Sequence, residues 1–214
     1  MPVTIRKYTE LKLAISDYVQ RRNWTRLFEL CGTSDAETAK TIAVILTFYD
    51  PKRLWSFLEF VSRLSVAEKK EKRDSVATCC YLLGKIGQTR LEKSLDYLRN
   101  FLVNDHMQRG PVEAALSNLW VLNSRKTADL IWNQWVMKAG ENEDLQEIGI
   151  RSSEYLAKNA PDRISSFLGK VASLNSGQRV AARTATQILE EIGLPPGRKN
   201  GEKATPKIRK KARK

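Results

Sequence analysis

The residue types that could carry catalysis or bind a metal are few in this sequence. His106 is the single histidine, and the three cysteines are Cys31, Cys79 and Cys80. A nucleophile activated by histidine would have to be built on His106, which we expect in a surface loop over residues 104–109. Cys79 and Cys80 are adjacent, lack the two-residue spacing of a zinc knuckle and fall in a predicted helix, which favours a packing role. No phosphate-binding loop, dinucleotide glycine fingerprint or EF-hand loop is present, so we expect no metal and no cofactor.

Basic side chains are the residues that point to a partner. The 214 residues include 37 Lys and Arg against 24 Asp and Glu, a formal net charge of +13. Residues 195–214 carry +8 of this charge and residues 1–194 carry +5. The segment 195–214 begins Pro-Pro-Gly and has one large apolar residue, Ile208, so burial cannot offset the entropy of ordering it.

We therefore predict a disordered basic tail over residues 195–214. Charge runs of this kind often bind nucleic acid. The candidate contacts in the tail are Lys207, Arg209, Lys210, Lys211, Arg213 and Lys214. A tail that only keeps the protein in solution is the alternative.

Residues 1–194 contain an internal repeat. Four segments align without gaps: RDSVATCCYLLGKIG (73–87), RGPVEAALSNLWVLN (109–123), LQEIGIRSSEYLAKN (145–159) and RVAARTATQILEEIG (179–193). Their first residues lie 36, 36 and 34 positions apart. Two columns are mostly apolar and lie seven residues, or two helical turns, apart, which predicts one buried stripe. These columns are Val76, Val112, Ile148 and Ala182, and Leu83, Leu119, Tyr155 and Leu189.

A second helix is expected between successive copies. These helices are placed near residues 51–64, 90–103, 125–138 and 161–173. Helices are also expected near residues 7–22, 24–31 and 35–49, the last with Ser34 and Glu37 in capping-box positions. No segment shows sustained alternation with hairpin turns, so strands are not expected. The sequence predicts an all-α fold of about eleven helices in antiparallel pairs.

The paired helices and the period near 36 residues resemble HEAT repeats over residues 35–193. The resemblance implies a right-handed α-solenoid, armadillo-like, with about five antiparallel pairs in one domain over residues 1–194 and with the second helices lining the concave face. Tetratricopeptide repeats have a similar period, but their Trp-Leu-Gly-Tyr and Ala-Phe-Pro pattern is missing. Ankyrin repeats rank lower because no copy carries Thr-Pro-Leu-His.

Arginine and lysine recur at related positions in these repeats. Arg73, Arg109 and Arg179 occupy one column of the first helices, and Arg90, Lys93 and Arg125 lie on the second helices. Packed helices are about 10 Å apart, so such residues would form a ladder that follows a phosphate backbone without reading sequence. The alternative is that these side chains pair with Asp and Glu on neighbouring helices.

A small, basic, HEAT-like domain is similar to the bacterial alkylpurine DNA glycosylases of DNA alkylation repair. That resemblance implies duplex DNA on a basic concave face, with tryptophans and a catalytic carboxylate beside the lesion. The cluster of this type here lies on one predicted helix and consists of Arg125, Asp129, Trp132 and Trp135, with Asp129 and Trp132 as the candidate catalytic residues. The family pattern has Trp four residues before Asp, a spacing that no tryptophan of this chain has.

The composition limits the remaining functions. No apolar run reaches the roughly 18–20 residues that span a bilayer, and residues 1–12 lack the apolar core of a signal peptide. An odd number of cysteines argues against a disulfide framework, so we expect a cytoplasmic protein. The leading hypothesis is a non-catalytic solenoid that binds nucleic acid, with duplex DNA favoured. A DNA glycosylase and a protein-interaction scaffold are the alternatives, the last of which would have a protein partner.

Overall fold

In the computed structural model the described residues are 5–33, 35–140, 142–174 and 178–195, and this part of the chain is helical without a strand. The α-helices are α1 (Ile5–Arg21), α2 (Trp24–Leu30), α3 (Ala36–Leu46), α4 (Pro51–Arg63), α5 (Val66–Glu71), α6 (Arg73–Ile86), α7 (Leu91–Asn104), α8 (Arg109–Leu122), α9 (Ser124–Leu130), α10 (Glu143–Arg151), α11 (Glu154–Asn159), α12 (Ser165–Ala172) and α13 (Arg179–Glu191). Three short 3₁₀ segments are η1 (Gly87–Arg90), η2 (His106–Gln108) and η4 (Pro161–Arg163), and η3 (Ile131–Met137) is a π-helix that continues α9. The predicted all-α class is confirmed.

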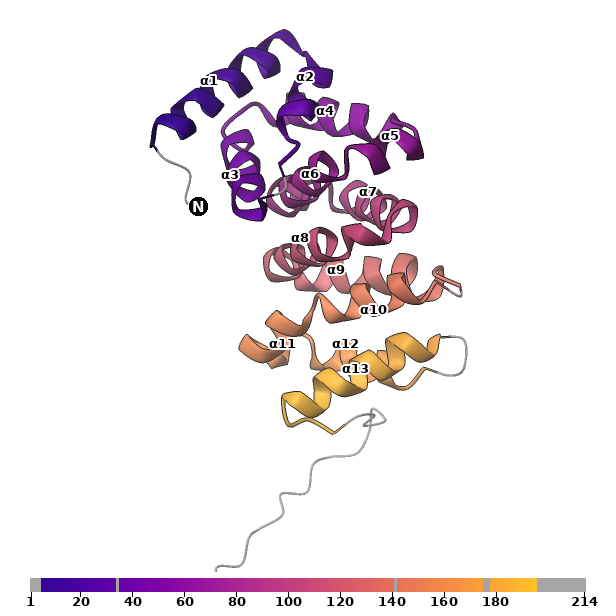
Figure 1. The fold of residues 1–214 in the computed structure, drawn as a ribbon. Helices are drawn as coiled ribbons and strands as arrows, with labels where there is room; N and C mark the ends of the chain where they lie inside the picture. The colour runs from indigo at the N-terminus through magenta and orange to yellow at the C-terminus, as the bar shows by residue number, and fades with distance from the viewer. Residues whose placement is uncertain (1–4, 34, 141, 175–177, 196–214) are drawn as a thin grey trace, which may run out of the picture.

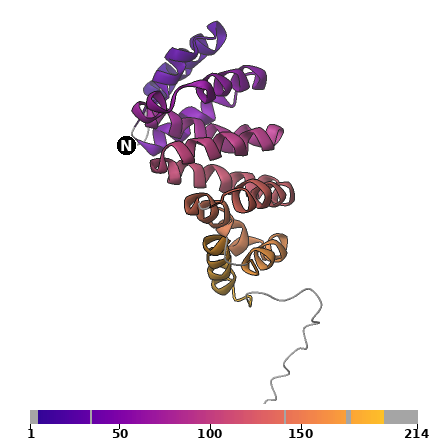
Figure 2. The same cartoon turned by 90° about the vertical axis from the view of Figure 1, so that its right-hand side faces the viewer.

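The helices form two layers along the length of the molecule. In the first layer α3 packs on α6, α6 on α8, α8 on α10 and α10 on α13, in chain order (Figure 1). The second layer contains α4, α7, α9 with η3, and α12, and Figure 2 shows the two layers side by side. The helices α1 and α2 cover the N-terminal end of both layers. Each segment that was predicted between repeat copies therefore lies in the second layer.

Most residues of the two repeat columns are buried in the first-layer helices. Val76, Val112 and Ile148 are at most 2% exposed. Leu83 and Leu119 are fully buried, and Leu189 is 2% exposed. One hydrophobic core runs through both layers because α6, α8, α10 and α13 all turn this stripe inward.

The third repeat copy departs from the predicted stripe. Tyr155 is 61% exposed, although its column predicted a buried residue. The predicted single helix is interrupted, because α10 ends at Arg151 and α11 begins at Glu154. The interruption changes the helical register, and Leu156, 3% exposed, is buried in place of Tyr155. The last copy drifts similarly, since Ala182 is half-buried while Ala181 is fully buried.

The start of α3 is capped by a different residue from the one predicted. Asp35 is the N-cap, and its carboxylate accepts a hydrogen bond from the Thr38 backbone N–H at 3.1 Å and another from the Thr38 hydroxyl. The Thr38 hydroxyl, followed by its backbone N–H, lowers the pKa of Asp35. Ser34, the predicted cap, lies outside the described residues. Ser65 and Glu68 form a capping box at α5, a short helix that the sequence analysis missed.

The three cysteines pack in the interior as free thiols. Cys31, Cys79 and Cys80 are each at most 1% exposed. Burial raises the pKa of Cys31 to about 12 and raises the pKa of the other two thiols as well. The predicted packing role is confirmed. His106 lies exposed in the 3₁₀ turn η2, within the predicted loop.

Candidate nucleic-acid interface

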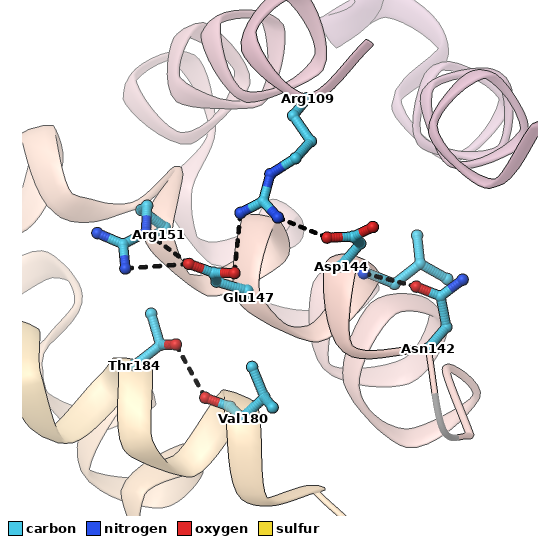
Figure 3. A network of polar contacts seen from close by, with 8 residues as sticks. Arg109, Asn142, Asp144, Glu147, Arg151, Val180 and Thr184 are labelled. Atoms are coloured by element: carbon cyan, nitrogen blue, oxygen red, sulfur yellow. Dashed lines mark hydrogen bonds and ion pairs between the residues drawn. The ribbon is translucent and has the colours of Figure 1, made fainter. Parts of the chain in front are cut away.

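The predicted arginine column of the first layer joins successive helices. Arg109, at the start of α8, contacts Asp144 of α10 at 2.5 Å and Glu147 at 2.8 Å, as Figure 3 shows. Arg73, at the start of α6, lies with Nε 3.4 Å from a carboxylate oxygen of Asp105, which is 7% exposed. Arg179 is exposed and has no ion pair within the described part of the chain. Arg109 is thus engaged by acids of the next first-layer helix, and Arg73 by Asp105 at the end of α7.

The Arg109 contacts belong to a network that keeps its members charged. Glu147 accepts hydrogen bonds from Arg109 and Arg151. Burial acts to raise the pKa of Glu147, but these two arginines outweigh it and lower the pKa. The hydrogen bond to Glu147 raises the pKa of Arg109 in turn. Each of the charges has a counter-charge, so this network stabilises the contact between α8 and α10 and leaves little free positive potential.

The second layer carries the excess of positive charge. The helices α4, α7, α9 and α12, with η1, η3 and η4, contain ten Lys and Arg against five Asp and Glu. The corresponding numbers for the first layer, α3, α6, α8, α10 and α13 together with α11, which follows α10 after a two-residue break, are eight and nine. Among the described residues of the second layer, the ion pairs are Arg63–Glu59 at 2.8 Å and Lys93–Glu59 at 3.8 Å. Most second-layer cations therefore have no acidic partner.

Neighbouring helices of the second layer run in the same direction. Arg90 lies over Trp55, and Lys93 pairs with Glu59. The contacting residues therefore follow the same order along α4 and α7, which makes the two helices parallel. Arg163 donates to the Ser124 hydroxyl at 3.3 Å, near the starts of α12 and α9. Lys170 and Trp132 meet further along the same two segments. The N-termini of α4 and α7 consequently lie at one end of that pair, as do those of α9 and α12.

Six cations lie at these N-termini, and we call them the cationic edge. The set is Lys52, Arg53, Arg90, Arg125, Lys126 and Arg163. Five of the six are exposed and Arg53 is half-buried. A cation in the first turn of a helix opposes the helix dipole by roughly 0.3–1 kcal/mol. The first turn of α9 contains no acid and its N-cap is the neutral Asn123, whereas α4 begins at the N-cap Asp50, whose carboxylate accepts a hydrogen bond from the Lys52 backbone N–H. The arrangement creates a concentrated positive potential, which suits a polyanion.

Aromatic rings contact three second-layer cations, of which Arg90 belongs to the cationic edge. The Arg90 guanidinium lies 5.3 Å from the centre of the Trp55 ring, and the Lys170 ammonium lies 3.6 Å from that of Trp132. Lys93 lies 5.5 Å from the centre of Tyr97. Contacts of this kind hold the long side chains in place without neutralising them.

The candidate catalytic residues lie on either side of the junction between α9 and η3. Asp129 is exposed at the end of α9, and Trp132 is half-buried beneath Lys170. The α-helical register that predicted a shared face ends at Leu130, because η3 winds as a π-helix. Trp135 is fully buried. A Cβ added at Gly149 would lie 3.1 Å from the Trp135 Cβ, so the backbone of α10 packs closely on this residue. Neither Asp129 nor Trp132 lines the surface cleft described below.

The remaining expectations concern metal, membrane and the tail. The described residues contain no group of three or more His, Cys, Asp or Glu side chains placed to hold a metal ion. No helix in the same residues is long and apolar enough to cross a membrane. The predicted tail contacts lie outside the described residues: Lys207, Arg209, Lys210, Lys211, Arg213 and Lys214.

Comparisons of the chain with known protein families, with curated proteins and with solved structures give no match. The functional assignment therefore depends on the geometry and charge of the molecule itself.

Proposed function

We propose that the chain is a non-catalytic, right-handed α-solenoid of HEAT-like antiparallel helix pairs that binds nucleic acid, with duplex DNA as the preferred form. The cationic edge of the second layer would contact the phosphates. The basic tail would add a diffuse attraction that weakens with salt. The single observation that supports this proposal most is the concentration of unpaired cations at second-layer N-termini, where they oppose the helix dipoles.

The distribution of ion pairs argues for a binding role over a purely structural one. First-layer arginines such as Arg109 are neutralised by acids across the helix contact. The exposed cations Arg125 and Lys126 have no such acid in the described structure. The 10 Å step between packed helices suits contacts to a sugar–phosphate backbone, and such contacts do not distinguish base sequences.

A matched pair of variants tests the proposal in the full-length protein. The edge variant carries Arg53→Gln, Arg125→Gln and Lys126→Gln. The control variant carries Lys12→Gln, Lys85→Gln and Arg183→Gln, which removes the same charge from exposed cations without ion pairs elsewhere on the described surface. Affinity for a labelled 20-base-pair duplex of arbitrary sequence is measured by fluorescence anisotropy at several salt concentrations.

We expect the edge variant to bind at least tenfold more weakly at low salt. Its slope of log affinity against log salt should be shallower by about 2–3, one counterion for each lost phosphate contact. The control should change the slope by less than about 1. Equal losses in the two variants would show that only overall charge matters, and would refute the cationic edge as the binding surface. An RNA duplex of the same length, run in parallel, tests the preference for DNA.

A further inference from the structure

A surface cleft lies at the start of α6, outside the cationic edge. It has a volume of about 260 Å³ and is lined by Glu29, Gly32, Glu71, Lys72, Arg73, Asp74 and Ser75. Five of these residues, 71–75, are consecutive and form the junction of α5 and α6. Because α6 ends where α7 begins, the cleft is separated from the α7 end of the cationic edge by the length of α6, about 20 Å.

The helix end in this cleft has unsatisfied backbone donors. Lys72 occupies the N-cap position of α6, and no side chain caps the helix. The first intrahelical bond runs from the Val76 N–H to the Lys72 carbonyl at 3.2 Å. The N–H groups of Arg73, Asp74 and Ser75 are therefore the free donors of a 14-residue helix, at the positive end of its dipole.

The Ser75 side chain is an independent sign of a ligand. Ser75 is 2% exposed and lines the cleft, and its hydroxyl has no hydrogen-bond partner among the described residues. The Ser75 Oγ is not among the fully buried unpartnered atoms of the described residues, so the hydroxyl is open to the cleft, where a ligand or water can complete its hydrogen bonding. Space is left above the hydroxyl because residue 32 is glycine, and a Cβ there would lie 3.1 Å from the Ser75 Oγ.

The charges around the cleft select among anions. Lys72 and Arg73 bring positive charge, although each also contacts an acid, Glu29 at 3.5 Å and Asp105 at 3.4 Å. Glu71 and Asp74 are exposed carboxylates at the rim. A carboxylate repels a fully ionised anion such as sulfate but accepts a hydrogen bond from an anion that still carries a proton. Inorganic phosphate and phosphate monoesters carry a P–OH group near neutral pH, the monoesters in part.

We propose that the cleft at the start of α6 binds a protonated phosphate group, held by the free N–H groups of residues 73–75 and the Ser75 hydroxyl, with a rim carboxylate accepting a hydrogen bond from its P–OH group. The proposal is independent of nucleic-acid binding at the cationic edge. Free phosphate and a phosphate monoester share the chemistry, and the test below distinguishes them.

The experiment titrates ¹⁵N-labelled full-length protein with sodium phosphate, glycerol 3-phosphate or sodium sulfate, at constant ionic strength, and follows backbone amide shifts. We expect saturable shifts of the Asp74 and Ser75 amides with phosphate and the monoester. Sulfate should bind at least tenfold more weakly. The tighter of the two phosphate compounds identifies the source of the group.

Two variants connect these shifts to the cleft. Ser75→Ala should weaken phosphate binding by about tenfold or more, as expected for one hydrogen bond to an anion, without loss of stability, because no bond within the protein is removed. Gly32→Ala should abolish binding by filling the space above Ser75. Gly169→Ala, a matched glycine control with nothing within 4 Å of its added Cβ, should bind normally. Absence of a saturable shift, equal binding of sulfate, or unchanged binding by Ser75→Ala would each overturn the proposal.

Discussion

We expect Gly84→Ala, at the contact between α6 and α8, to destabilise the protein, and Gly169→Ala in α12 to stabilise it. Gly84 is buried in α6 against α8. A Cβ added there would lie 2.8 Å from the Ala115 Cα and 3.2 Å from the Ala115 carbonyl oxygen. Both atoms belong to the backbone, so they cannot turn away as a side chain could. In α12, a Cβ at Gly169 would have nothing within 4 Å.

The expected magnitudes follow from two opposing effects. Alanine is favoured over glycine inside a helix by roughly 1 kcal/mol. Overpacking of a filled interior costs roughly 1–3 kcal/mol, and the upper part of this range applies where the α6 and α8 backbones must separate. We therefore expect Gly84→Ala to lower the free energy of unfolding by about 1–2 kcal/mol. Gly169→Ala should raise it by about 0.5–1 kcal/mol.

Urea unfolding followed by far-UV circular dichroism measures both changes, provided that the dependence on urea is unchanged between variants. The melting temperature should move by about 2–4 °C for each kcal/mol in a chain of this size, in opposite directions for the two variants. If Gly84→Ala were as stable as the wild type with an unchanged urea dependence, the close approach of the α6 and α8 backbones would be refuted.

Three further predictions concern side chains of the interior and a helix cap. Trp120 donates from Nε1 to the Ser152 hydroxyl at 2.9 Å, whereas the buried Trp135 Nε1 has no partner, so Trp120→Phe should cost about 1 kcal/mol more in urea unfolding than Trp135→Phe. Hydrogen bonds from Thr38 in the first turn of α3 lower the pKa of Asp35. Its carboxylate therefore stabilises the fold above the unfolded-state pKa of about 3.9, and this contribution is lost as pH falls through the folded-state pKa. The difference in unfolding free energy between wild type and Asp35→Asn should shrink below about pH 4 in a series of urea unfolding measurements at decreasing pH. Burial raises the pKa of Cys31 to about 12, so Ellman's reagent at pH 8 should leave the native thiol unmodified and label it rapidly in urea.

The sequence predicts the helices well because their apolar periodicity and proline starts are local signals. The segments predicted near residues 51–64, 90–103 and 125–138 appear as α4, α7 and α9 with η3. The break after Arg151 was missed because the segment 145–159 keeps helix-forming residues throughout. At the interruption, the Ser152 hydroxyl accepts a hydrogen bond from Trp120 Nε1 of α8, a contact that arises only in the folded chain.

The candidate site was predicted less completely. Sequence reasoning found the cations but could not tell Arg109, which pairs across the α8–α10 contact, from Arg125, which has no acid partner, because pairing depends on which helices meet. The π-helix η3 has no sequence signature, so the face shared by Asp129 and Trp132 was inferred from an α-helical spacing. The short helix α5 could have been found, since Ser65 and Glu68 form a capping box readable in the sequence.

The uneven distribution of polar links also has a mechanical consequence. On the first layer, Arg109 ties α8 to α10 and the Gly84–Ala115 contact brings the α6 and α8 backbones close together. On the second layer, neighbouring helices are linked by cation–aromatic contacts such as Arg90 on Trp55 and Lys170 on Trp132, and by the longer Lys93–Glu59 ion pair at 3.8 Å. We therefore expect the molecule to bend about the first layer, so that neighbouring helices of the second layer move apart or closer together. Small rotations between first-layer helices would then change the spacing between the cations of the second layer.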